Sequence, residues 1–196
     1  MKSPDILRSI QPVVKAFDQL SISYYIGGSI ASSVYGMARA TMDVDIVADM
    51  AFDQVPSFVR LLREEYYIDA QMINGAIASA SSFHLIHLET IMKVDVFVLK
   101  KDPYHQSALA RKSEDRLVEE DPDSTFYLAS PEDIILSKLQ WYQAGGRASE
   151  RQWLDVLGVI KVQSNSLNRE YLITWSNTLG VLDLLKQAFA ESGMEL

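Results

Sequence analysis

Two aspartates stand two residues apart in a stretch that otherwise has the composition of a buried strand. Residues 41–49 read TMDVDIVAD, and the apolar residues around the acids predict a strand over 44–48. Because alternate residues of a strand point to the same face, Asp43 and Asp45 would lie side by side although like charges repel. Two carboxylates on one face suit a divalent cation such as Mg²⁺, which prefers oxygen ligands and shares its shell with substrate phosphates. The pattern also allows a solvated edge strand, or Asp43 as a turn residue.

A third isolated acid lies on another predicted strand. Residues 83–88 and 92–99 predict a hairpin, and Asp95 is the only acid in its second strand. Taken alone, Asp95 could be a satisfied polar residue at a strand end. Three acids inside apolar strands are harder to explain in that way, because an unpaired charge in a central strand is costly.

A pair of glycines lies upstream of the acids, between a predicted strand over 23–26 and a predicted helix over 30–35. Glycine lets the backbone approach a ligand closely, and a helix N-terminus offers free N–H groups and partial positive charge to a phosphate. The hydroxyl of Ser29 could add to such a site. A plain tight turn at Gly27 and Gly28 is the alternative. Together with three carboxylates, the turn predicts metal-assisted nucleotidyl transfer, in which the protein supplies position and charge neutralisation.

Two longer motifs carry a family resemblance. The motif Gly27-Gly28-Ser29, followed after 13 residues by Asp43-Val44-Asp45-Ile46 and later by Asp95 in an apolar strand, resembles the DNA-polymerase-beta-type nucleotidyltransferase superfamily. More narrowly, the stretches GGSIASSVYGMARATMDVDI and SPEDIILSKLQWYQAGGRASERQWLDVLGVI resemble small bacterial nucleotidyltransferases related to abortive-infection toxins, and the resemblance covers roughly residues 20–162. The resemblance implies an α+β fold, with a nucleotidyltransferase-type mixed sheet flanked by helices and followed by an α-helical C-terminal region.

The resemblance also implies roles for the carboxylates and the glycine turn. Asp43 and Asp45 would bind two Mg²⁺ or Mn²⁺ ions, and Asp95 would complete one metal site and act as, or beside, the general base. The residues implied to bind the nucleotide at the turn are Gly27, Gly28 and Ser29.

Three further residues are candidates for the substrate site. The resemblance implies that Lys138 reaches the phosphates as a catalytic residue and that Asp155 supports the pocket from the following helix. Both lie among apolar residues, so a salt bridge between two helices is the alternative. Arg39 precedes the acids by four residues and could meet phosphate or base, or could instead neutralise Asp43.

The rest of the chain predicts a helical second half. A helix is predicted over 4–20, kinked or split by Pro12, and another over 52–65, followed by a short strand over 66–70. Residues 100–124 are charged and predict a turn at 121–123, and 126–128 predict a brief extended piece. Ser130 and Pro131 form a strong helix start. Beyond them the pattern predicts only helices, over 131–144, 149–163, 168–178 and 180–191. We therefore predict a catalytic α/β domain over 1–115 and a helical domain over 116–196.

Composition limits the possible functions. A net charge of −8 and a pI of about 4.9 disfavour a broad nucleic-acid-binding face. The chain has no cysteine, which excludes disulfides and thiolate catalysis and fits a reducing cytoplasm. Residues 1–17 lack the apolar core of a signal peptide, and no run of 18 uncharged apolar residues predicts a membrane span. The expected location is the cytoplasm.

The predicted function is the transfer of a nucleoside monophosphate from an NTP to an acceptor, with release of pyrophosphate. The acceptor could be a tRNA end, a protein hydroxyl or a small molecule such as an aminoglycoside. The narrower resemblance implies a toxin with an antitoxin partner. The alternatives are a nucleotide-binding module that acts through a protein partner with little turnover, and a structural domain whose acids are all surface groups.

Overall fold

The computed structural model describes residues 4–38, 41, 43–116 and 125–196. These residues form two compact units. The first contains the described parts of Met1–Gly27 and Ala40–Leu128, and the second contains those of Gly28–Arg39 and Ala129–Leu196. The predicted domains, 1–115 and 116–196, stay a prediction, because a compact packing unit is not by itself an independently folding domain.

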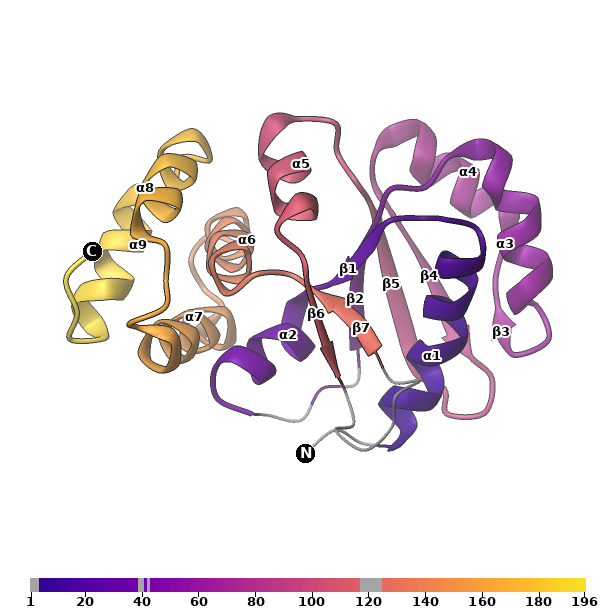
Figure 1. The fold of residues 1–196 in the computed structure, drawn as a ribbon, viewed down its shortest axis with the longest axis horizontal. Coiled ribbons are helices and arrows are strands. Elements are labelled where there is room, and N and C mark those ends of the chain that lie inside the picture. The colour runs from indigo at the N-terminus through magenta and orange to yellow at the C-terminus, as the bar shows by residue number, and fades with distance from the viewer. Residues whose placement is uncertain (1–3, 39–40, 42, 117–124) are drawn as a thin grey trace. The chain divides into compact units, whose positions relative to one another are not determined.

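The first unit is built on a mixed sheet, shown in Figure 1, which has seven strands among the described residues. In spatial order the strands are β3 (Tyr66–Tyr67), β4 (Ser82–His87), β5 (Lys93–Val98), β2 (Asp43–Ala48), β1 (Tyr24–Ile26), β7 (Thr125–Leu128) and β6 (Ser113–Arg116). β2 pairs with β5 in parallel and with β1 in antiparallel orientation, and β4 and β5 form the predicted hairpin. The predicted α+β class, with a mixed sheet, is confirmed.

The helices of this unit differ from prediction in three places. They are α1 (Pro4–Gln19), the 3₁₀ helix η1 (Phe52–Gln54), α3 (Val55–Leu62), α4 (Ala70–Ser79) and α5 (Pro103–Ala110). α1 is one helix with Pro12 inside it, so the split, one of the two predicted effects of Pro12, is wrong. α4 and α5 were not predicted, although each begins with a capping aspartate. Asp69 accepts from the N–H of Met72 at 2.7 Å, and Asp102 accepts from that of His105 at 3.0 Å.

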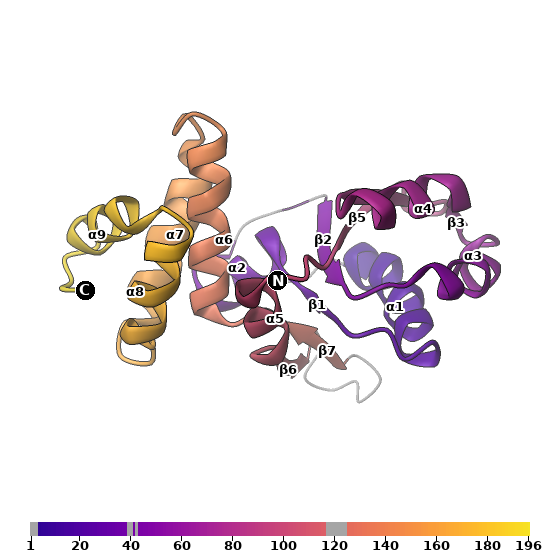
Figure 2. The same ribbon diagram turned by 90° about the horizontal axis from the view of Figure 1, so that it is seen from above.

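The core of the first unit lies on one face of the sheet. Phe17 of α1 stacks on Phe58 of α3 with ring centroids 5.1 Å apart, and Phe58 meets Phe83 of β4 edge-on at 6.4 Å. Figure 2 shows α1, α3 and α4 grouped on that side. Alternate residues of β2, β4 and β5 are buried, and those between them are half-buried or exposed. Polar groups of these three strands therefore share the opposite face.

The second unit is helical, as predicted. It contains α2 (Gly28–Tyr35), α6 (Pro131–Ala144), α7 (Glu150–Gln163), α8 (Arg169–Thr178) and α9 (Leu182–Glu191). The predicted start of α6 is confirmed, because Ser130 Oγ accepts from the N–H of Asp133 at 3.2 Å and Pro131 follows the cap. Within the described ranges, every helix is too short or too polar to traverse a lipid bilayer.

Candidate active site

The three predicted carboxylates lie on one face of two adjacent strands. Asp45 of β2 and Asp95 of β5 are direct register partners in the parallel pair, and Asp43 lies two residues before Asp45. Neighbouring strands are about 4.8 Å apart, so the backbones place these side chains next to one another. Asp43 is exposed, whereas Asp45 and Asp95 are half-buried. The face that carries them is the one opposite the aromatic core.

The sequence analysis missed a cation in this cluster. Lys93 is the register partner of Asp43, and its Nζ lies 2.8 Å from Oδ2 of Asp95. The hydrogen bond to Asp95 is the largest effect and raises the pKa of Lys93. Burial, the next largest, lowers it, and the charges of Asp95, Asp43 and Asp45 raise it, so that the net direction is upward. The alternation of MKVDVFV contains the signal for this residue, because Lys93 and Asp95 are two apart in one strand.

A histidine extends the row of side chains. His84 of β4 is the antiparallel register partner of Asp95, so Asp45, Asp95 and His84 occupy neighbouring positions across three strands. The half-buried His84 therefore shares a sheet face with the acids. His87 belongs to the other face, where it is buried, and its Nδ1 pairs with the hydroxyl of Thr90 at 2.9 Å. This register could not be predicted from single strands.

The glycine turn is joined to the acidic strand by a backbone bond. The N–H of Gly27, which follows β1, donates to the carbonyl of Asp45 at 2.8 Å. Gly28 is the first residue of α2 and has a φ of 54°, a left-handed conformation that favours glycine over any residue with a Cβ. Ser29 is the second residue of α2, and its carbonyl accepts from the hydroxyls of Ser32 and Ser33. The strand–glycine–helix turn is confirmed.

Lys138 and Asp155 are brought together inside the second unit. Lys138 Nζ on α6 lies 2.8 Å from Oδ2 of Asp155 on α7 and donates to Gln152 at 3.1 Å. Both charged side chains are buried, at 4% and 7% exposure. The structure therefore contains the interhelical salt bridge that the sequence left open as an alternative. Any role of Lys138 toward phosphates stays a prediction.

Two predicted features lie outside the described residues. They are Arg39, the candidate phosphate or base contact, and the turn at 121–123.

The donor chemistry of the cluster fits a divalent cation. In the described part of the chain, no group of three or more His, Asp or Glu side chains is arranged to hold a metal ion by itself. Asp95 is engaged with Lys93. Mg²⁺, however, is usually held by one or two carboxylates together with substrate phosphates and water, rather than by an all-protein cage. Asp43, Asp45 and Asp95 carry carboxylate oxygens of the kind that such a shared site would need.

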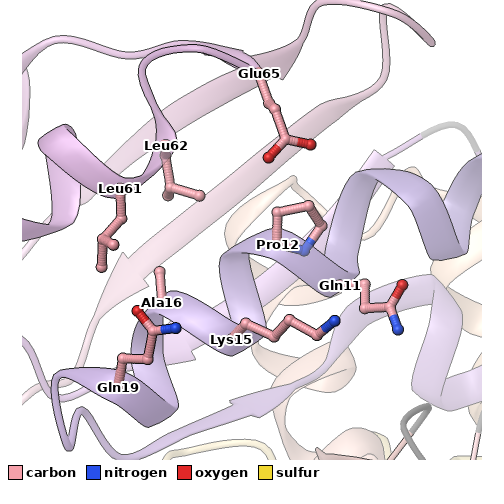
Figure 3. A pocket seen from close by; sticks show the side chains of 8 residues that line it. All are labelled: Gln11, Pro12, Lys15, Ala16, Gln19, Leu61, Leu62 and Glu65. Carbon is pink, nitrogen blue, oxygen red and sulfur yellow. The ribbon is translucent and has the colours of Figure 1, made fainter.

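A pocket of about 320 Å³ lies elsewhere in the first unit. Figure 3 shows that it is lined by side chains of α1, among them Gln11 and Lys15, and by residues at the end of α3, among them Leu62 and Glu65. None of the predicted site residues lines it. The pocket belongs to the helical side of the sheet and not to the carboxylate cluster.

No family model matches the chain, and no curated protein matches its sequence. Solved structures do match. The antibiotic-resistance factor ANT(2'')-Ia is 13% identical, with a TM-score of 0.54 over 94% of this chain and 93% of that one. The lincosamide adenylyltransferase LnuA, bound to lincomycin, is 13% identical, with a TM-score of 0.51 over 83% of this chain and 98% of that one. An antigenic nucleotidyltransferase-like protein from Paracoccidioides brasiliensis is 17% identical, with a TM-score of 0.54 over 99% and 96%.

The chain has a nucleotidyltransferase-like fold. Identities of 13–17% establish this shared fold but not a shared reaction or substrate. The predicted nucleotidyltransferase-type fold is therefore confirmed, whereas the narrower resemblance to abortive-infection toxins stays a prediction.

Proposed function

We propose that this protein is a metal-dependent nucleotidyltransferase that moves a nucleoside monophosphate from an NTP to the hydroxyl of an acceptor. The observation that carries the proposal is the register of β2 and β5, which places Asp45 beside Asp95 and Asp43 on the same face. A purely structural sheet gains nothing from adjacent carboxylates, because like charges on neighbouring strands are destabilising. A bound cation removes that cost.

The glycine turn supplies the phosphate side of the proposed site. Backbone N–H groups at a helix start, the hydroxyl of Ser29 and the close backbone approach that glycine allows at Gly27 and Gly28 suit a triphosphate. The N–H of Gly27, which follows β1, is hydrogen-bonded to the carbonyl of Asp45, so the first residue of the turn is held against the strand that carries Asp43 and Asp45. Lys138 and Arg39 stay candidate phosphate contacts, and Asp155 stays a candidate support.

The carboxylates supply the metal side. Asp43 and Asp45 would hold divalent ions, Mg²⁺ or Mn²⁺, and Asp95 would complete one of the sites. Bound ions of this kind neutralise triphosphate charge and lower the pKa of an attacking hydroxyl. In the transfer, the acceptor oxygen forms a bond to the α-phosphorus while the bond to pyrophosphate breaks. In this proposal Asp95 would take the hydroxyl proton or orient the group that takes it.

A small molecule is the acceptor that we favour. The net charge of −8 works against a long polyanion and suits a cationic or neutral ligand. ANT(2'')-Ia, an antibiotic-resistance factor, and LnuA, which was solved with lincomycin, match nearly their whole length. A tRNA or protein acceptor, with a toxin role and an antitoxin partner, is the second candidate, supported by the sequence resemblance. A cytoplasmic location would serve either.

The alternative function is a nucleotide-binding module with little turnover. Such a protein would keep the glycine turn and bind an NTP without transferring its nucleoside monophosphate. Turnover therefore separates the two functions.

The test is label transfer by the purified chain. It would be incubated with Mg²⁺ or Mn²⁺, each α-labelled NTP in turn, and one of three acceptors: a panel of aminoglycosides and lincosamides, total tRNA, or lysate protein. We expect label on an acceptor and release of pyrophosphate. The control pair is Asp43→Ala with Asp45→Ala against Asp53→Asn, an exposed acid of η1. Transfer that survives the double substitution would refute the site, and nucleotide binding without transfer to any acceptor would favour the binding module.

A further inference from the structure

The sheet face that carries the three carboxylates also carries a cation, the ammonium group of Lys93. The Lys93 ammonium lies 2.8 Å from Asp95, with 45% of its side chain exposed, while Asp95 is 21% exposed. Lys93 is also the register partner of Asp43, which belongs to the neighbouring strand. Two neighbouring strands thus each contribute two residues to one group: Asp43 and Asp45 from β2, and Lys93 and Asp95 from β5. Three of the four side chains are negative and one is positive.

This arrangement has an electrostatic consequence. Three carboxylates on one face repel one another, and a single ammonium offsets part of that repulsion. The same ammonium occupies an oxygen of Asp95 and repels any cation that approaches the cluster. The Lys93 ammonium therefore both stabilises the carboxylates and competes with a metal ion for them.

We propose that Lys93 is the internal counter-cation of the site and that a divalent ion must displace it from Asp95 in order to bind. This inference rests on the proposed function, since it assigns a role in metal uptake to a residue outside the predicted ligand set. In this role the ammonium of Lys93 reduces the repulsion between the carboxylates before an ion binds. It also raises the metal concentration that is needed to fill the site. Lys93 is thus a positioning residue, not a metal ligand.

The effect has a calculable size. A unit charge about 5 Å from a divalent ion in a water-like dielectric changes the ion's affinity by about tenfold. Lys93→Met removes the charge and keeps a flexible apolar chain. We therefore expect Lys93→Met to bind Mn²⁺ about tenfold more tightly than the unmodified chain. We also expect it to have a lower melting temperature in EDTA and a larger upward shift on adding Mn²⁺.

Two matched variants control for charge and for folding. Lys101→Met makes the same change in net charge at an exposed lysine that pairs with Asp49, which follows the end of β2 four residues beyond Asp45. That site is about 13 Å away along the strand, farther than the screening length of about 10 Å, so its effect on the affinity should be small. Lys93→Arg keeps the charge and should bind Mn²⁺ no more tightly than the unmodified chain.

The experiment titrates Mn²⁺ alone into the full chain at 0.1 M salt, reading free Mn²⁺ by electron paramagnetic resonance and heat by calorimetry. Tighter binding by Lys93→Met only, lost when Asp95→Asn is added, supports the proposal. Unchanged or weaker binding by Lys93→Met, or an equal gain in Lys101→Met, overturns it while leaving the proposed function standing. If no variant binds Mn²⁺ in an Asp45-dependent way, both this inference and the metal site of the proposed function fail.

Discussion

Asp45 and Asp95 are register partners in adjacent parallel strands, so two carboxylates stand side by side on one face of the sheet, with Lys93 paired to one of them. A sheet that served stability alone would place opposite charges or apolar groups there. Under the proposed function, local stability on this sheet face is given up for ligand binding. Stability and activity should therefore respond in opposite directions to substitutions at these positions.

Asp45→Asn tests that opposition. The amide keeps the shape of the side chain but removes the repulsion with Asp95, so we expect the free energy of unfolding in EDTA to rise by about 0.5–1 kcal/mol. Nucleotidyl transfer should fall by about a hundredfold or more, as when one group that stabilises transition-state charge is lost. Urea unfolding and the transfer assay measure the two effects. A variant that is less stable and still active would contradict both the repulsion and the role.

Lys138→Met should be strongly destabilising. It leaves the carboxylate of Asp155 buried without the ammonium that lies 2.8 Å away. Breaking a buried pair in this way costs about 3–5 kcal/mol, and urea unfolding would measure the loss.

The double substitution Lys138→Met with Asp155→Leu separates structure from function. An apolar pair of similar volume often replaces a buried ion pair without net loss, so most of the stability should return. If Lys138 also reaches the phosphates, the folded double variant should still show a raised KM for NTP. Full activity in a folded double variant would assign the pair to packing alone.

Gly36→Ala should displace α2 from α7. A Cβ at Gly36 would lie 2.9 Å from the carbonyl oxygen of Ser32 and 2.9 Å from the backbone nitrogen of Val159, which are backbone atoms that cannot yield easily. Overpacking of this kind costs about 1–3 kcal/mol, measured by thermal unfolding. Because α2 begins at the proposed phosphate turn, KM for NTP should rise as well.

Gly75→Ala is the matched control for Gly36→Ala. Gly75 is exposed within α4, and a Cβ there would meet nothing within 4 Å. Alanine in a helix interior is favoured over glycine by about 0.5–1 kcal/mol, so this variant should gain stability and keep its KM. Equal losses in both variants would show that the packing of Gly36 is not the cause.

Tyr66→Phe should lower the free energy of unfolding and make it depend less steeply on pH under alkaline conditions. The phenol of Tyr66 is buried and donates to the carbonyl of Ser9 at 2.8 Å, a bond worth about 1 kcal/mol. Burial, and secondarily the charge of Glu65, raise the pKa of Tyr66. The folded chain therefore prefers the protonated phenol, and this stabilisation is complete below pH of about 10 and lost as pH rises toward the folded pKa.

Urea unfolding between pH 7 and 11 measures the alkaline effect. Stability of the unmodified chain should fall above pH of about 10, and that of Tyr66→Phe should fall less steeply. Tyr24, whose pKa is also raised by burial, keeps part of the slope in the variant. Tyr67→Phe, a change at an exposed neighbour, should leave the profile unaltered, and a slope equal to that of the unmodified chain in Tyr66→Phe would contradict the assignment.

Local patterns were enough to predict much of the fold. The caps at Ser130 and Pro131, the alternation around Asp45 and Asp95, and the glycines after β1 each act within a few residues, so a linear reading finds them. α4 and α5 escaped because their weakly amphipathic sequences, AQMINGAIAS and PYHQSALA, give little periodic signal. Their capping aspartates, Asp69 and Asp102, were the signal to use.

The sequence by itself determined which residue types stand at which local positions: three acids in apolar strands, a glycine turn before a helix, and one lysine among the apolar residues of a helix. Only the tertiary structure decided which residues lie next to them in space. The pairing of β2 with β5 put Asp45 next to Asp95, and the position of Lys93 neutralised part of that charge. The packing of α6 on α7 joined Lys138 to Asp155. Strand register and helix packing are set by the burial of whole faces, a property of the assembled core that no short stretch of sequence contains.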